Sequence, residues 1–204
     1  MFSAGTDILS ATLVWAMTEL IRHPQLMKDI QREIRELGKG KPFMTEDDLG
    51  NIPYLKLVLK ETLRLHPPAP LLVPRESIEP TTLQCYDIPA KTRIIVKAWA
   101  IGRGPIKWEE PEEFQPRRFL NKPVDYKGTD FEMIPFGGGR RECPGVLFTV
   151  PTMELPLANL LYLFDWNLPG NATRVEDIDI AESFGILVNK TSPLLLVATP
   201  HSSK

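Results

Sequence analysis

A cysteine preceded by three glycines and two arginines is the most chemically informative feature of the sequence. The segment runs Phe136-Gly137-Gly138-Gly139-Arg140-Arg141-Glu142-Cys143-Pro144-Gly145. Glycines allow tight turns with positive φ. The arginines and the N-terminus of the helix expected to follow place positive charge beside the sulfur, which favours the thiolate form. A thiolate on such a loop is a soft ligand, suited to iron or another thiophilic metal.

Two other interpretations of this loop stay open from its spacing alone. A phosphate-binding loop would need a Gly-Lys-Ser/Thr ending or the Rossmann glycine spacing, and the segment has neither. A structural turn with an incidental cysteine accounts for the glycines equally well.

Glu61 and Arg64 form a second notable pair, three residues apart on an expected helix that begins at Pro53 and ends near His66. Apolar neighbours on both sides place the pair in an apolar stripe, where charges must find partners inside the protein. An ordinary surface ion pair is the alternative.

The elements expected around these residues are mainly helices, with a few short strands. Apolar residues that recur every three or four positions predict helices over 1–22, 25–37, a short stretch after Thr45, 53–66 and 146–164, the last with a kink or late start at Pro151 or Pro156. Expected strands span 71–73, 82–87, 92–97 and 193–197, and residues 88–91 would join the second and third as a hairpin. Residues 99–135 lack periodicity, and a loop this long is usually functional or disordered.

Composition indicates a soluble globular protein. The 204 residues are 43% hydrophobic and 25% charged, and the formal net charge of −2 gives no reason to expect nucleic acid as a partner. No signal peptide is visible, because the opening stretch lacks a basic region and contains Asp7 and Glu19. Cys85 and Cys143 could form one disulfide, but two free thiols are the more economical interpretation.

The cysteine segment resembles the haem-binding loop of the cytochrome P-450 family. The family pattern F-x-x-G-x-R-x-C-x-G is matched in full by Phe136, Gly139, Arg141, Cys143 and Gly145. By this resemblance, Cys143 is the axial ligand of the haem iron, Arg141 binds a haem propionate and Phe136 shields the sulfur. A thiolate ligand favours cleavage of the O–O bond in such proteins.

The helical pair resembles the E-x-x-R motif of the same family. The resemblance adds Arg118, in the segment Pro116-Arg117-Arg118-Phe119, although Arg117 stands where the family usually has Glu. It implies a structural role for Glu61, Arg64 and Arg118, which would lock the core beneath the haem. Arg75 would bind the second propionate, and a solvated loop arginine is the alternative.

The opening helix, with Ala4-Gly5-Thr6-Asp7-Ile8, resembles the family segment A-G-x-D/E-T, where oxygen binds. The resemblance assigns the catalytic positions to Gly5, Thr6 and Asp7: Gly5 would leave room for dioxygen and Asp7 would deliver protons. Ile8 replaces a threonine hydroxyl, so we expect weakened or altered oxygen activation. Thr12 lies one turn further, roughly 6 Å along the axis, and is not expected to substitute fully.

Substrate contacts are implied at apolar positions that are equally good core residues. These positions are Ala69, Leu72, Val73, Phe184 and Ile186.

The resemblance implies a fold that is mainly α with small antiparallel β-sheets (α+β). Residues 1–204 would be the C-terminal haem-binding part of a cytochrome P-450 domain, with the N-terminal half and membrane anchor absent. It implies a haem-thiolate monooxygenase that takes electrons from NADPH-cytochrome P-450 reductase and inserts one atom of dioxygen into a small apolar substrate. The full-length family lies on the cytoplasmic face of the endoplasmic reticulum membrane. The residues around the motifs resemble those of plant members, which implies a role in plant specialised metabolism. The alternatives are a truncated, non-catalytic remnant, or a related isomerase or dehydratase that does not activate dioxygen.

Overall fold

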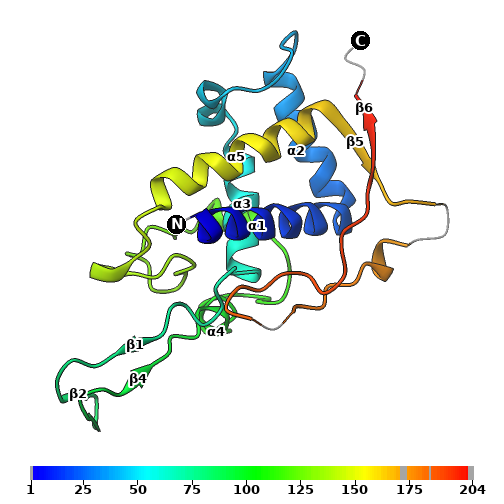
Figure 1. Ribbon diagram of the computed structural model, residues 1–204. Helices are drawn as coiled ribbons and strands as arrows, with labels where there is room; N and C mark the ends of the chain where they lie inside the picture. The colour runs from blue at the N-terminus through cyan, green and yellow to red at the C-terminus, as the bar shows by residue number, and fades with distance from the viewer. Residues whose placement is uncertain (1, 171–173, 184, 202–204) are drawn as a thin grey trace.

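The protein folds mainly into helices with small antiparallel sheets (Figure 1). The computed structural model describes residues 2–170, 174–183 and 185–201, without the side chains of residues 2–4 and 177. The helices are α1 (Phe2–Arg22), α2 (Pro24–Leu37), α3 (Pro53–Leu65), α4 (Ala98–Ile101) and α5 (Val146–Leu163). Short 3-10 helices are η1 (Glu46–Asn51), η2 (Pro116–Phe119), η3 (Gly139–Arg141) and η4 (Val175–Asp177). The strands are β1 (Arg75–Glu76), β2 (Thr81–Leu83), β3 (Tyr86–Ile88), β4 (Arg93–Ile94), β5 (Phe164–Asn167) and β6 (Val197–Pro200).

The core lies among α1, α2, α3 and α5. The sequence of α2 explains why this helix packs in the core. Met27, Ile30 and Ile34 recur on one face of the helix and are buried, while the other face is charged. The helix ends before Gly38, where a Cβ atom would lie 2.5 Å from the ring of Tyr162. The Tyr162 hydroxyl donates to the carbonyl oxygen of Gly38 at 2.5 Å, so glycine lets α5 approach the end of α2.

Helix α5 is a core helix. It runs without interruption from Val146, so the expected late start at a proline is wrong. Met153, Leu157 and Leu161 on its inner side are fully buried. Within the described residues it is the one helix long and apolar enough to cross a membrane by length and composition, and one face of it packs in the core.

The strands β1 to β4 form a projecting arm, visible at the lower left of Figure 1. The predicted hairpin of 82–87 with 92–97 is wrong, because the chain turns earlier, at Gln84 with a φ of +54°. Strand β2 therefore pairs with β3, and β4 pairs with β1 through Arg75 opposite Ile94. The strand expected at 71–73 is also wrong, since Leu72 has a φ of +51° and its N–H donates to the carbonyl of Ala69.

The last sheet pairs β5 with β6. Residues 164–167 form a strand in which Trp166 lies opposite Ala198. Phe164 was expected to end the preceding helix but belongs to this strand. The final strand lies at Val197–Pro200, later than the expected 193–197. Leu194 and Leu196 of that apolar run pack against the core instead, so their apolar character reflects packing and not strand pairing.

Candidate active site around Cys143

The cysteine loop closes on itself just before α5. The N–H of Cys143 donates to the carbonyl oxygen of Phe136 at 2.9 Å, and the N–H of Glu142 donates to that of Gly139 at 3.1 Å. Phe136 and Cys143 are half-buried against the core, whereas Arg140 and Arg141 are exposed. Cys143 is a free cysteine, as is the exposed Cys85. The loop therefore holds a single unmodified sulfur at the start of a buried helix.

The three glycines of the loop have different functions in the backbone. Gly137 and Gly139 have φ values of +76° and +70°, a region that side chains disfavour. Gly138 is extended, but a Cβ atom there would lie 2.9 Å from the carbonyl oxygen of Gly128. A Cβ atom at Gly139 would meet no atom within 4 Å, so this glycine borders open space.

Phe136 packs against the ring of Tyr126. The two rings meet edge to face with centroids 6.0 Å apart. Burial, together with the nearby negative charges of Asp125 and Glu154, raises the pKa of Tyr126 to about 12. Tyr126 is therefore neutral near pH 7 and packs against Phe136 as an uncharged ring.

The segment that carries Arg75 lies beside the cysteine loop. The Arg75 guanidinium donates to the carbonyl oxygen of Arg141 at 3.2 Å, and the structure thus brings the two predicted propionate-binding residues together. Leu72 is also adjacent, with its Cδ1 atom 4.0 Å from where a Gly137 Cβ would lie. Val73 is 76% exposed and Ala69 is half-buried.

The predicted oxygen-binding residues lie on the first turns of α1. Gly5, Thr6 and Asp7 are exposed, and a Cβ at Gly5 would meet no atom within 4 Å. Helix α1 packs on α5, and Figure 1 shows its N-terminal end on the side where α5 begins. Thr12 is fully buried and its hydroxyl donates to the carbonyl oxygen of Ile8 at 2.8 Å. The Thr12 hydroxyl is therefore already engaged with its own helix.

Glu61 and Arg64 are completely buried, unlike a surface ion pair. Arg64 donates to both carboxylate oxygens of Glu61 at 2.8 and 2.9 Å. Arg118 donates to the same carboxylate at 3.0 Å, so the three predicted structural residues meet. The remaining Arg64 donors reach main-chain oxygens of the long loop, namely those of Gly102, Pro111 and Glu113.

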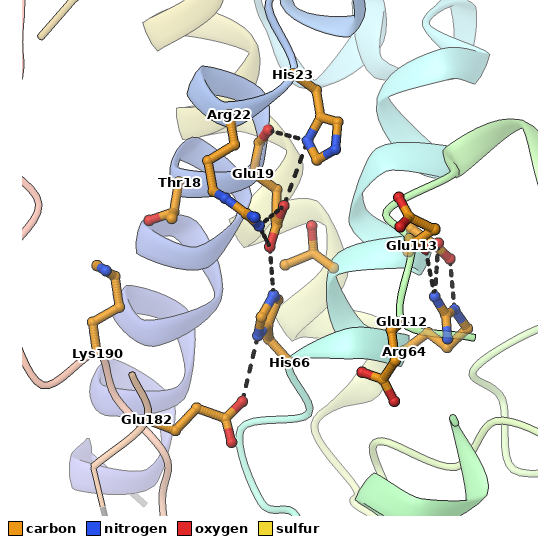
Figure 2. Close-up of polar contacts among 12 residues, drawn as sticks. Thr18, Glu19, Arg22, His23, Arg64, His66, Glu112, Glu113, Glu182 and Lys190 are labelled. Atoms are coloured by element: carbon orange, nitrogen blue, oxygen red, sulfur yellow. Dashed lines mark hydrogen bonds and ion pairs between the residues drawn. The ribbon is translucent and has the colours of Figure 1, made fainter. Parts of the chain in front are cut away.

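Sequence reasoning missed a second polar cluster, formed by His66 with Glu19 and Trp15. His66 Nε2 lies 2.8 Å from a Glu19 carboxylate oxygen (Figure 2). The His66 ring also stacks on Trp15, with ring centroids 3.9 Å apart. The polar Glu19 inside the apolar pattern of the first helix was the available signal. Of the remaining predicted substrate residues, Ile186 is 79% exposed, and Phe184 lies outside the described residues.

The residues around Cys143 fit a flat, apolar, dianionic cofactor such as haem. One soft sulfur ligand stands on a loop that Arg75 contacts through the carbonyl oxygen of Arg141, and both arginines carry guanidinium groups that can bind carboxylates. Open space at Gly139 and Gly5 leaves room next to the loop and next to α1.

Comparison with known proteins decides the family. The family model for cytochrome P450 matches residues 1–197. The chain belongs to the cytochrome P-450 family. The resemblance inferred from the sequence and the predicted fold class are thereby confirmed.

Plant members of the cytochrome P-450 family are about half identical to the chain. "Cytochrome P450 71A1" of Persea americana is 55% identical over 203 residues, which are 100% of this chain and 40% of that protein. "Tabersonine 16-hydroxylase 2" of Catharanthus roseus is 50% identical, again over 100% of this chain and 40% of that protein. The chain thus spans about 40% of the length of these curated relatives.

A solved cytochrome P-450 has the same fold. A zebrafish cytochrome P-450 solved with abiraterone superposes with a TM-score of 0.87 at 30% identity. The match covers 98% of this chain and 47% of the zebrafish chain. The roles given above to individual residues stay predictions.

Proposed function

We propose that the complete protein is a haem-thiolate monooxygenase that inserts one atom of dioxygen into a small apolar organic substrate. The observation that carries the proposal is the loop of Cys143, which presents one free sulfur beside Arg75 and Arg141. A relative over the whole of this chain is named a hydroxylase, which supports the same class of reaction.

Cys143 would ligate the iron, and Arg75 and Arg141 would bind the propionates. When bound, a thiolate-ligated haem supplies the reductive activation of dioxygen. Gly145 would keep the chain close to the sulfur without covering it, since a Cβ there would lie 3.7 Å from Cys143 Sγ, and Gly139 would leave open space for the cofactor. Phe136 would exclude water from it, since its ring is held by Tyr126.

On the opposite side, the first turns of α1 would handle oxygen and protons. Gly5 leaves room for dioxygen because it carries no side chain, and Thr6 follows it on the exposed turn. Asp7 is exposed and would carry a proton on its carboxylate oxygen from solvent toward the oxygen site. The substrate would contact the apolar positions Ala69, Leu72, Val73 and Ile186, together with Phe184.

Electrons would come from NADPH-cytochrome P-450 reductase. Exposed Arg140 beside the cysteine loop offers positive charge to an acidic partner. We place the complete enzyme at the cytoplasmic face of the endoplasmic reticulum membrane and in plant specialised metabolism, in accord with the plant relatives.

A second candidate function is isomerisation or dehydration without activation of dioxygen. Ile8 favours it, because Ile8 has no hydroxyl and the nearest buried hydroxyl, on Thr12, is bonded within the helix.

A carbon monoxide spectrum tests the proposal. The protein is expressed with haem, reduced and exposed to carbon monoxide, and the Soret band of thiolate ligation is expected. Cys143→Ser should abolish this band, while the matched control Cys85→Ser, at an exposed position, should keep it. Unchanged haem content and spectrum in Cys143→Ser would overturn the proposal. Oxygen consumption with NADPH and reductase then separates a monooxygenase from an isomerase.

A further inference from the structure

Residues 181–191 form a hairpin that carries a proposed substrate contact at its tip. The N–H of Thr191 donates to the carbonyl of Ala181 at 2.9 Å, and Glu182 and Lys190 form an antiparallel bridge. Ile186 at the tip is 79% exposed. The contacts that hold this hairpin therefore decide where Ile186 lies.

The hairpin is tied to the helical core by its main chain and by its side chains. The N–H of Val188 donates to the carbonyl of Pro68 at 2.9 Å. Glu182 and Lys190 are directly opposite, so their side chains lie on one face of the hairpin. Figure 2 shows Lys190 beside α1 and Glu182 directed at His66. The Lys190 ammonium lies 5.4 Å from the Trp15 ring centroid.

His66 lies between two carboxylates on different elements. Its Nε2 atom is 2.8 Å from Glu19 on α1, and its Nδ1 atom is 3.5 Å from Glu182 on the hairpin. His66 is only 7% exposed, and among the described residues Nδ1 has an ion-pair neighbour but no hydrogen bond. His66 therefore stands between α1 and the hairpin, with one carboxylate next to each ring nitrogen.

The charges around His66 come from three elements. Burial raises the pKa of Glu19, but the hydrogen bond with His66 and the nearby positive charges outweigh it, and the pKa lies below its ordinary value of 4.5. Glu19 is therefore an anion near pH 7. The charged and titratable groups facing this cluster are Glu19, Arg22 and His23 on α1, Glu182 and Lys190 on the hairpin, and Arg103 near Glu182.

We propose that His66 is a positioning residue, which holds the hairpin 181–191 through Glu182 and so sets where Ile186 meets the substrate. The substrate contact rests on the proposed function, while the tether itself does not.

Hydrogen exchange of the intact protein tests the tether. The variant Glu182→Gln keeps the side-chain shape, and the control Glu176→Gln changes an exposed carboxylate outside the hairpin. Glu182→Gln and His66→Asn should speed exchange at the amides of Ser183, Val188 and Thr191 about fivefold, with no change in the control. Wild-type protection in Glu182→Gln would overturn the tether, whether or not His66→Asn folds.

Spectral titration of the haem-loaded protein tests the positioning. Imidazole serves as a small iron ligand and 4-phenylimidazole as a probe with an added apolar ring. Glu182→Gln and Ile186→Ala should each weaken binding of 4-phenylimidazole about threefold or more and leave imidazole unchanged. Equal affinity of Glu182→Gln and the unchanged protein for 4-phenylimidazole would overturn the positioning role. No spectral shift with either ligand in the unchanged protein would count instead against the haem-thiolate function.

Discussion

Replacing Arg64 by lysine should destabilise the protein severely, although it conserves the charge. The Arg64 guanidinium makes five hydrogen bonds, two to Glu61 and three to main-chain oxygens. Lysine has three N–H donors, so at least two of these five hydrogen bonds are lost. Each hydrogen bond that involves a charged group contributes roughly 1.5–3 kcal/mol, and the pair is fully buried, so the loss is about 3–6 kcal/mol. This approaches the entire stability of an ordinary domain, about 5–15 kcal/mol.

Urea denaturation followed by tryptophan fluorescence measures the change. Trp108 is a suitable reporter, since its ring centroid lies 5.2 Å from the Arg64 guanidinium. The control is Arg117→Lys, because Arg117 is 66% exposed and its ion pair with Asp29 should contribute less than about 1 kcal/mol. A loss below about 1 kcal/mol in Arg64→Lys, or equal losses in both variants, would refute the reasoning.

Three further variants probe other parts of the site. In Glu19→Gln the free energy of unfolding should depend less on pH in acid, as measured by denaturation at pH 3 to 7. The pKa of Glu19 is lowered in the folded protein. Its contribution to the free energy of unfolding is therefore present above about pH 4.5 and is lost as the pH falls through the lowered pKa. Ile8→Thr should raise the product formed per NADPH consumed in the complete enzyme, and no gain would count against a deficit at this position. Gly138→Ala should lower the free energy of unfolding by about 1–3 kcal/mol and lower haem content, because the added Cβ would press on the carbonyl oxygen of Gly128. An unchanged melting temperature would contradict this expectation.

The helices and the cysteine loop were predictable because their signals are local. Apolar periodicity and Pro24 at the start of α2 specify that helix from a short stretch of sequence. The loop was predictable because positive φ and close approach at Gly137 to Gly139 admit few other residues.

The strands were predicted poorly because their pairing is decided by distant residues. Strand β1 pairs with β4, and nothing within either two-residue strand specifies the other. Strand β5 follows α5 directly, and its partner β6 lies near the end of the chain. The cluster of His66 and Glu19 was missed for the same reason, since 47 positions separate the two residues.

The loop between α4 and Cys143 links the buried charges of α3 to Cys143. This stretch contains little regular structure, so its main-chain carbonyls need donors from elsewhere. Helix α3 supplies them: Arg64 donates to Gly102 and Pro111, and Lys60 donates to Val124 at 3.0 Å. A planar guanidinium fixes the distances between its acceptors, which a flexible ammonium does not. A change in α3 therefore acts on the position of Cys143 through the loop that leads to it.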